Sequence, residues 1–268
     1  MVRSLIYVLL FLDKPSGRSI SDRLLPQGRK KAERLLSKKN MLKAVLFDMD
    51  GVLYDSMGNH AVAWVQSMKK FGINMTADDA YATEGARGVD TIRYMVKQQQ
   101  GRDITEEESQ LMYDEKTRIF HSMPEAPIMP GILSLMEQIH AAGITIGVVT
   151  GSGQRPLINR ILRDFGRFVS IDNITTAYDV KKGKPNPDPY LMGLRKAGNL
   201  QPSEAMVVEN APLGIRAGVA AGIYTIAVNT GPLDDQILLN AGANILFPTM
   251  TALSDAWKNL SEGQVPDR

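Results

Sequence analysis

Short apolar runs that alternate with helix-like stretches most constrain what this chain can fold into. Six of the runs are expected to be strands: Ala44–Phe47, Ile144–Val149, Ile171–Thr176, Ala205–Val208, Tyr224–Val228 and Ala243–Phe247. Stretches with helical spacing of apolar residues follow or separate them: Ile132–Ala142, Arg155–Phe165, Pro189–Ala197, Pro212–Ala221 and Gln236–Ala241. This alternation predicts an α/β fold with a doubly wound parallel sheet that helices cover on both faces.

The segment from residue 56 to residue 128 interrupts the alternation. It contains no convincing strand, and its pattern predicts several helices: His60–Phe71, Val89–Gln99 and Thr105–His121. Thr105 and Glu108 have the spacing of a capping box, which marks the start of the last of these helices. We therefore expect a core made of residues 41–55 and 129–268, with residues 56–128 inserted as an α-helical cap over the active site.

Two carboxylates directly follow the first predicted strand, in the sequence Asp48-Met49-Asp50. In an extended segment, side chains two residues apart point the same way, so Asp48 and Asp50 share one site. Carboxylates are costly to bury together unless a cation or a reaction needs them. Parallel sheets of this kind bind ligands outside the carboxyl ends of their strands. The pair therefore predicts metal-assisted phosphoryl chemistry, with one aspartate as nucleophile and the other as acid/base.

Two further motifs follow other predicted strands. Thr150-Gly151-Ser152 offers a hydroxyl group and backbone amides that can hold a phosphoryl oxygen. Lys184, in a Gly-Lys-Pro sequence, is a fixed cation that would balance carboxylate and phosphate charge. Each motif is weak evidence when taken alone, and their order along the chain is what makes them informative.

Glu209 and Asn210 form the fourth motif, with oxygen atoms suited to a hard cation such as Mg²⁺. Together, the four motifs resemble those of the haloacid dehalogenase (HAD)-like hydrolase superfamily, and the resemblance covers residues 41–268. The subgroup that fits is that of β-phosphoglucomutase-like phosphohydrolases. This resemblance implies a Rossmann-like core with an inserted helical cap.

The resemblance also implies a mechanism through a phospho-aspartate intermediate, with Mg²⁺ as the cofactor. Asp48 would be the nucleophile, and Asp50 would protonate the leaving group and then activate water. Thr150 and Lys184 would hold the transferring phosphoryl group. The metal ligands would be Asp48, the backbone oxygen of Asp50, and Asn210.

One departure from the pattern concerns the metal. The fourth motif of the superfamily usually ends in Asp, whereas Asn210 supplies an amide oxygen without charge. Glu84, in a loop between the first predicted cap helices, could complete the metal shell; otherwise it is an exposed loop residue. A glutamate at this position of the cap resembles a small branch of inorganic pyrophosphatases. That branch also shares Glu-Asn-Ala-Pro-Leu-Gly (209–214) and Asn-Thr-Gly-Pro-Leu (229–233).

Three more residues of the predicted cap are candidates for substrate contact. His60 resembles a cap histidine that hydrogen-bonds the acid/base Asp when the cap closes; the alternative is a solvated or capping histidine. Lys116 would be a cation near the leaving phosphate, and the alternative is an exposed helix lysine. Arg87, in the same loop as Glu84, is a further candidate.

These observations favour a Mg²⁺-dependent phosphohydrolase that acts on a small phosphorylated substrate, with inorganic pyrophosphate preferred. The first alternative is a β-phosphoglucomutase or a phosphatase for a small sugar phosphate. The second is a HAD-fold binding protein without catalytic activity.

Composition and charge limit the remaining possibilities. The absence of cysteine excludes disulfides, thiolate metal sites and Cys nucleophiles, and fits a cytoplasmic protein. Residues 1–40 carry ten basic and three acidic residues; since the whole chain has a net charge of +2, the other 228 residues carry −5 and indicate no nucleic-acid partner. The apolar run Leu5–Leu12 is far shorter than the roughly 20 residues of a membrane span. We expect residues 1–40 to be a poorly ordered extension or the product of a mis-assigned start codon. No obligate protein partner is expected.

Overall fold

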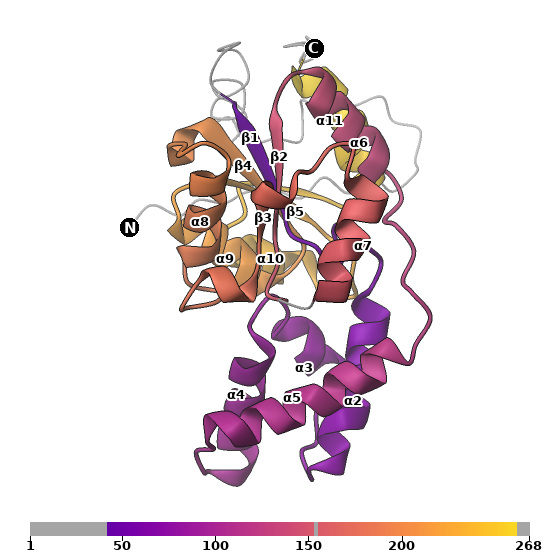
Figure 1. Ribbon diagram of the computed structural model, residues 1–268, viewed down its shortest axis with the longest axis vertical. Helices are drawn as coiled ribbons and strands as arrows, with labels where there is room; N and C mark the ends of the chain where they lie inside the picture. Colours follow the sequence, from indigo (N-terminus) through magenta and orange to yellow (C-terminus); the bar gives the residue numbers. More distant parts are fainter. Residues whose placement is uncertain (1–41, 153–154, 262–268) are drawn as a thin grey trace.

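The computed structural model describes residues 42–152 and 155–261 of the 268-residue chain. The expectations for residues 1–40 lie outside the described residues. Six parallel strands form one sheet in the order β3-β2-β1-β4-β5-β6. Their bounds are β1 (Ala44–Phe47), β2 (Thr145–Val149), β3 (Ile174–Thr175), β4 (Ala205–Glu209), β5 (Tyr224–Val228) and β6 (Ile245–Phe247). The predicted parallel, doubly wound sheet is confirmed (Figure 1).

Helices cover both faces of this sheet (Figure 1). One face is covered by α6 (Ile132–Ala141), α7 (Arg155–Phe165) and α11 (Met250–Ser261), and the other by α8 (Asp188–Lys196), α9 (Pro212–Ala220) and α10 (Asp235–Asn240). Alternate strand residues point to opposite faces, so Val45 and Phe47 of β1 pack in the first layer while Ala44 and Leu46 pack in the second. Burial on both faces explains why the strands are continuous apolar runs.

Two expectations about the core elements need correction. The third strand is shorter than predicted, because residues Ile171–Asn173 form a 3-10 turn and only Ile174–Thr175 pair with β2. The Ser170 hydroxyl accepts a hydrogen bond from the Asp172 N–H, a local bond that competes with strand pairing. Helix α11 was not predicted, although its Leu253 and Trp257 belong to the core beneath α6.

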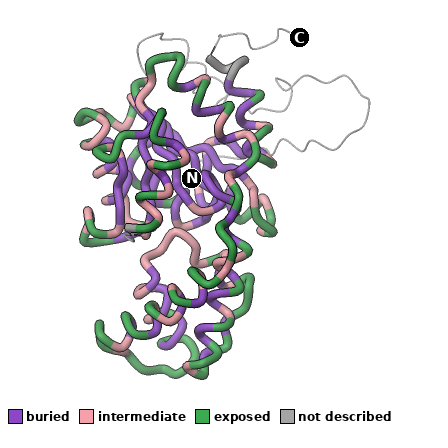
Figure 2. The backbone as a smooth tube through the Cα atoms, turned by 45° about the vertical axis from the view of Figure 1, so that its right-hand side comes forward, coloured by how far each residue is buried: buried purple, intermediate pink, exposed green. Residues whose placement is uncertain are grey.

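A second helical layer lies beyond the carboxyl ends of the strands (Figure 1). It consists of α2 (Met57–Lys70), α3 (Ala77–Ala82), α4 (Gly88–Gln100) and α5 (Glu106–His121). These helices bury an apolar cluster of their own, which Figure 2 shows as buried segments separate from those of the sheet. Thr105 caps α5 as predicted by accepting the Glu108 N–H. Helix α3 was not predicted. Because of this additional helix, Glu84 lies between the second and third helices of the layer, α3 and α4.

Two linkers connect the helical layer to the sheet, and they pair with each other. The Asp55 N–H donates to the Pro127 oxygen at 3.0 Å, and the Met129 N–H donates to the Leu53 oxygen at 2.9 Å. The Arg160 guanidinium of α7 lies 3.9 Å from the centre of the Tyr54 ring. None of the described helices is long and apolar enough to cross a membrane.

Candidate active site

A pocket of about 70 Å³ lies between the carboxyl ends of the strands and the helical layer. The loops after β1 and β2 line its sheet side, while α2, α5 and the loop between α3 and α4 line its other side. Eight of the residues that the sequence predicts for the site line it: Asp48, Asp50, His60, Glu84, Lys116, Thr150, Gly151 and Ser152. The fold therefore brings together predicted residues that lie far apart in the chain.

Asp48 and Lys184 form a buried ion pair at the centre of the site. The Lys184 Nζ donates to Asp48 Oδ1 at 2.5 Å, to Glu209 Oε1 at 2.6 Å and to the Val149 oxygen at 3.1 Å. Asp48 follows β1 and Glu209 ends β4, and these strands are neighbours where the strand order reverses. This switch point is where doubly wound sheets bind their ligands.

Asp50 contacts the helical layer through polar side chains. Its Oδ1 accepts a hydrogen bond from the Ser56 hydroxyl at 2.6 Å and lies 3.0 Å from His60 Nε2. The Lys116 Nζ lies 2.7 Å from His60 Nδ1. An ammonium group can only donate, so Nδ1 is the acceptor and the proton of the neutral ring lies on Nε2, facing Asp50. The proposed acid/base is thus held by residues of the helical layer and its linker.

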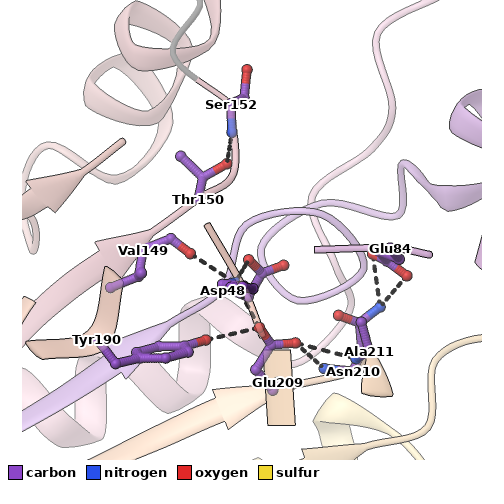
Figure 3. Close-up of polar contacts among 10 residues, drawn as sticks. Asp48, Glu84, Val149, Thr150, Ser152, Tyr190, Glu209, Asn210 and Ala211 are labelled. Atoms are coloured by element: carbon purple, nitrogen blue, oxygen red, sulfur yellow. Dashed lines mark hydrogen bonds and ion pairs between the residues drawn. The ribbon is translucent and has the colours of Figure 1, made fainter. Parts of the chain in front are cut away.

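Glu84 reaches from the helical layer to the end of β4. The Asn210 Nδ2 donates to both carboxylate oxygens of Glu84 at 3.2 Å (Figure 3). The Asn210 Oδ1 is buried and accepts no hydrogen bond from the described part of the chain. Gly51 allows this arrangement, because its φ is +77° and a Cβ there would lie 2.1 Å from Asn210 Nδ2. Glycine after the Asp-x-Asp pair therefore lets the first loop approach the fourth motif.

Thr150 and Gly151 form the sheet-side wall of the pocket. The Thr150 Oγ1 accepts the Ser152 N–H at 3.0 Å, which leaves the hydroxyl proton for a phosphoryl oxygen. A Cβ on Gly151 would lie 3.1 Å from the Gly85 oxygen and 3.3 Å from the Ala86 oxygen. The loop between α3 and α4 therefore packs closely on the loop after β2.

Arg87 is not among the described residues that line the pocket. Its guanidinium donates to both carboxylate oxygens of Asp90, at 2.7 and 3.0 Å. Its aliphatic stem packs against Gly183, where a Cβ would lie 2.7 Å from Arg87 Cγ. The structure thus does not bring Arg87 together with the other predicted substrate-binding residues.

The carboxylates of the site have shifted pKa values. Burial raises the pKa of Asp48 to about 7, against the opposing charge of Lys184 and with the added repulsion of Glu209. Burial, together with the charge of Asp48, raises the pKa of Glu84 well above its usual value. Burial acts in the same direction on Asp50, but His60 and Ser56 outweigh it and lower the pKa of Asp50 to about 2.

The same residues fit a hard divalent cation. A cation between Asp48 and Glu84 would favour the ionised form of both carboxylates, which burial disfavours, and would offset the repulsion of Glu84 by Asp48. The buried Asn210 Oδ1, which lacks a partner among the described residues, is a suitable oxygen donor. No group of three His, Asp or Glu side chains in the described ranges is placed to hold a metal ion. A ligand set would therefore have to combine carboxylate, amide and backbone oxygens, which Asp48, Glu84, Asn210 and the Asp50 backbone carbonyl could provide.

Comparison with known proteins identifies the family. The sequence profile of the haloacid dehalogenase-like hydrolases matches residues 45–228. The chain belongs to this family. It is 34% identical over 187 residues to hexitol phosphatase A of Escherichia coli, covering 70% of this chain and 83% of that protein. It is 29% identical over 196 residues to the β-phosphoglucomutase of Bacillus subtilis, covering 71% of this chain and 84% of the relative.

A solved structure from Bacteroides vulgatus agrees with this assignment. That protein, provisionally named a β-phosphoglucomutase, has 46% sequence identity and a TM-score of 0.81. The match covers 88% of this HAD-like hydrolase and 99% of the other chain. The predicted family and fold are confirmed, and β-phosphoglucomutase-like proteins are among the relatives, as predicted. The narrower resemblance to inorganic pyrophosphatases stays a prediction, since these relatives are named for sugar and sugar-alcohol phosphates.

Two polar residues of the site were not predicted. Ser56 lies at the N-cap position of α2, yet its hydroxyl donates to Asp50 instead of capping the helix. The Tyr190 hydroxyl donates to Glu209 Oε1 at 2.8 Å from α8 (Figure 3). Tyr190 is fully buried, and its spacing from Leu194 reads as ordinary core packing. Only the tertiary structure reveals its polar contact.

Proposed function

We propose that this HAD-like hydrolase is a Mg²⁺-dependent phosphohydrolase that works through a phospho-Asp48 intermediate. The observation that carries this proposal is the placement of Asp48 and Asp50 in one pocket with different partners. Lys184 holds the first, and Ser56 and His60 hold the second. In the metal-free protein the pKa of Asp48 is raised and that of Asp50 is lowered, so the roles of nucleophile and acid/base require a bound cation that lowers the first pKa and an anionic substrate that raises the second.

In the first step, an oxygen of Asp48 attacks phosphorus, and the bond from phosphorus to the leaving oxygen breaks. Asp50 gives its proton to that oxygen, which requires a protonated Asp50 when substrate is bound. In the second step, Asp50 takes a proton from water, the water oxygen bonds to phosphorus, and the acyl phosphate bond to Asp48 breaks. Asp50 has regained its proton, and phosphate leaves.

Thr150 would donate to an equatorial phosphoryl oxygen during both steps, and the positive charge of Lys184 beside Asp48 would stabilise the negative charge of the phosphoryl group. Asp48, the backbone oxygen of Asp50, Asn210 and Glu84 would hold Mg²⁺, which neutralises phosphoryl charge when bound. The helices α2–α5 would act as a cap (residues 56–128), since they supply His60 and Lys116 to the pocket. By excluding water, such a cap would strengthen the electrostatic contacts inside.

Two substrate classes remain, and a different observation supports each. The relatives favour a phosphorylated small sugar or sugar alcohol, because hexitol phosphatase A and β-phosphoglucomutase are named for such compounds. The aromatic side chains of Trp64, Tyr113 and Phe120 on the cap side of the pocket suit the apolar face of a sugar ring. Inorganic pyrophosphate is the second candidate. Glu84 supports it, because a carboxylate that holds the metal can lie beside an anionic leaving group without repelling it.

Side-by-side kcat/KM values with Mg²⁺ would decide between the classes, using pyrophosphate, glucose 6-phosphate, mannitol 1-phosphate and β-glucose 1-phosphate. Asp48→Asn should abolish all turnover, while Tyr224→Phe, a conservative change at the amino end of β5, should not. A preference of at least about tenfold for pyrophosphate, lost in Glu84→Gln, would support the second candidate. A preference of at least about tenfold for one of the sugar phosphates would support the first candidate class, a phosphorylated sugar or sugar alcohol. The absence of Mg²⁺-dependent hydrolysis of every compound would contradict the proposed function.

A further inference from the structure

The carboxylate of Glu209 has its acceptor positions filled by the protein itself (Figure 3). Oε1 accepts hydrogen bonds from Lys184 Nζ at 2.6 Å and from the Tyr190 hydroxyl at 2.8 Å. Oε2 accepts the backbone N–H groups of Asn210 at 3.0 Å and Ala211 at 3.1 Å. An ionised carboxylate offers about four lone-pair sites, so these four bonds leave none for a metal ion. Glu209 is also fully buried, with 0% of its surface exposed.

The space around Glu209 is shaped for this carboxylate. Gly214 lies in the first turn of α9, where a Cβ would lie 1.7 Å from Glu209 Oε1. Glycine inside a helix costs about 1 kcal/mol relative to alanine, so its presence here has a compensating reason. The two N–H groups that bind Oε2 come from the residues just before α9, where the helix dipole favours an anion.

Lys184 is held by three acceptors, which equals the number of its N–H donors. They are Asp48 Oδ1, Glu209 Oε1 and the Val149 oxygen. Lys184 is 3% exposed, so water does not replace a missing partner easily. The position of its Nζ against Asp48 therefore depends on where the Glu209 carboxylate lies. Tyr190 limits that position from the side of α8.

We propose that Glu209 and Tyr190 are positioning residues that hold Lys184 against Asp48, and that Glu209 is not a metal ligand. The proposal rests on the proposed function, since it assigns Lys184 to the transferring phosphoryl group. It differs from the expectation from the sequence that the oxygen atoms of Glu209 are suited to binding Mg²⁺. Asp48, the Asp50 carbonyl, Asn210 and Glu84 then remain as the protein ligands.

Tyr190→Phe tests the positioning role because it removes one hydroxyl without changing charge or ring packing. We expect kcat to fall about three- to tenfold with KM within about twofold, from the loss of one charge-assisted hydrogen bond. The Kd for Mg²⁺, measured by calorimetry without substrate, should stay within about twofold. Tyr224→Phe is the matched control, since Tyr224 is also buried but lies at the amino end of β5, and its kcat should be unchanged. A kcat of Tyr190→Phe equal to that of the wild type would overturn the role of Tyr190.

A crystal structure with Mg²⁺ bound tests the metal assignment directly. We expect both Glu209 oxygens to lie outside the coordination shell, and an oxygen within about 2.1 Å of the ion would overturn the proposal. In solution, Asn210→Ala should raise the Kd for Mg²⁺ at least about tenfold, whereas Glu209→Gln should raise it less than about threefold. A larger effect of Glu209→Gln would likewise count against the proposal. These binding readouts do not need turnover, so they still decide the place of Glu209 if the proposed hydrolase activity is not found.

Discussion

Asp48 gives a quantitative prediction about stability and pH in the metal-free protein. Burial raises the pKa of Asp48 from 3.8 to about 7, so the folded state holds its proton more tightly than the unfolded state. Between these two pH values the folded state binds more protons, and the free energy of unfolding falls as pH rises. A shift of about three pKa units corresponds to about 4 kcal/mol, because each unit is worth about 1.4 kcal/mol. About 3 kcal/mol of this loss should occur between pH 5 and pH 8.

Asp48→Asn removes the titrating group and keeps the shape of the side chain. In EDTA at pH 8 we expect the variant to be up to about 4 kcal/mol more stable than the wild type, with a smaller difference at pH 5. Urea unfolding at both pH values measures this, with equal m-values as the check on two-state behaviour. Added Mg²⁺ should stabilise the wild type more than the variant, since Asp48 is a proposed ligand. The variant should have no hydrolase activity despite its greater stability.

The pH dependence of the variant provides the control. Glu84 also has a raised pKa, so both proteins should retain some loss of stability toward high pH. The difference between the two curves reports the titration of Asp48 together with its repulsion of Glu84. If the free energy of unfolding fell equally in Asp48→Asn and in the wild type between pH 5 and pH 8, burial would not raise the pKa of the Asp48 carboxyl group. The argument that the site needs a cation would then fail.

Two further predictions concern the helical layer. Burial lowers the pKa of Lys116 to about 8, so the charged form that is present at pH 7 destabilises the folded state. Lys116→Met should therefore raise the free energy of unfolding at pH 7 by about 1–3 kcal/mol. The kcat of this variant should fall because the contact of Lys116 with His60 is lost. Calorimetry at pH 7 measures its stability, and a variant less stable than the wild type would contradict the stability prediction. Arg160→Met removes the guanidinium over Tyr54 and its hydrogen bond to the Ala126 oxygen, and should cost about 1–3 kcal/mol. Hydrogen exchange at the Met129 amide should become faster, and unchanged exchange would refute a role of Arg160 in fixing the linkers.

The sequence was sufficient for the parallel core because strands buried on both faces are continuous apolar runs, which stand out against helical periodicity. It was less informative where local hydrogen bonds decide the conformation. The 3-10 turn at Ile171–Asn173 depends on the Ser170 hydroxyl, and α3 depends on a reciprocal capping box between Thr76 and Asp79. The Thr-x-x-Asp spacing was visible in the sequence and could have predicted α3.

The candidate site was predictable to the extent that its residues follow strand ends. Asp48, Asp50 and Thr150 need only the sheet to bring them together. Tyr190 and Arg87 show where this reasoning stops. The partner of the Tyr190 hydroxyl depends on how α8 packs against β4. Arg87, which precedes α4, pairs with Asp90 of that helix and does not line the pocket. No sequence motif predicts either of these contacts.

The placement of Glu84 has a consequence for how metal binding and cap position depend on each other. The residue after Glu209 is an amide, so one of the two carboxylates proposed for the metal comes from the helical layer instead of the sheet. With Asn210 and Asp48 alone, Mg²⁺ would meet a single negative charge, and the affinity would be low. The proposed ligand set is complete only while the loop between α3 and α4 lies against Gly151 and the end of β4, as it does here. If Mg²⁺ binds through these proposed ligands, it favours this position of the loop by the same free energy by which the position favours Mg²⁺.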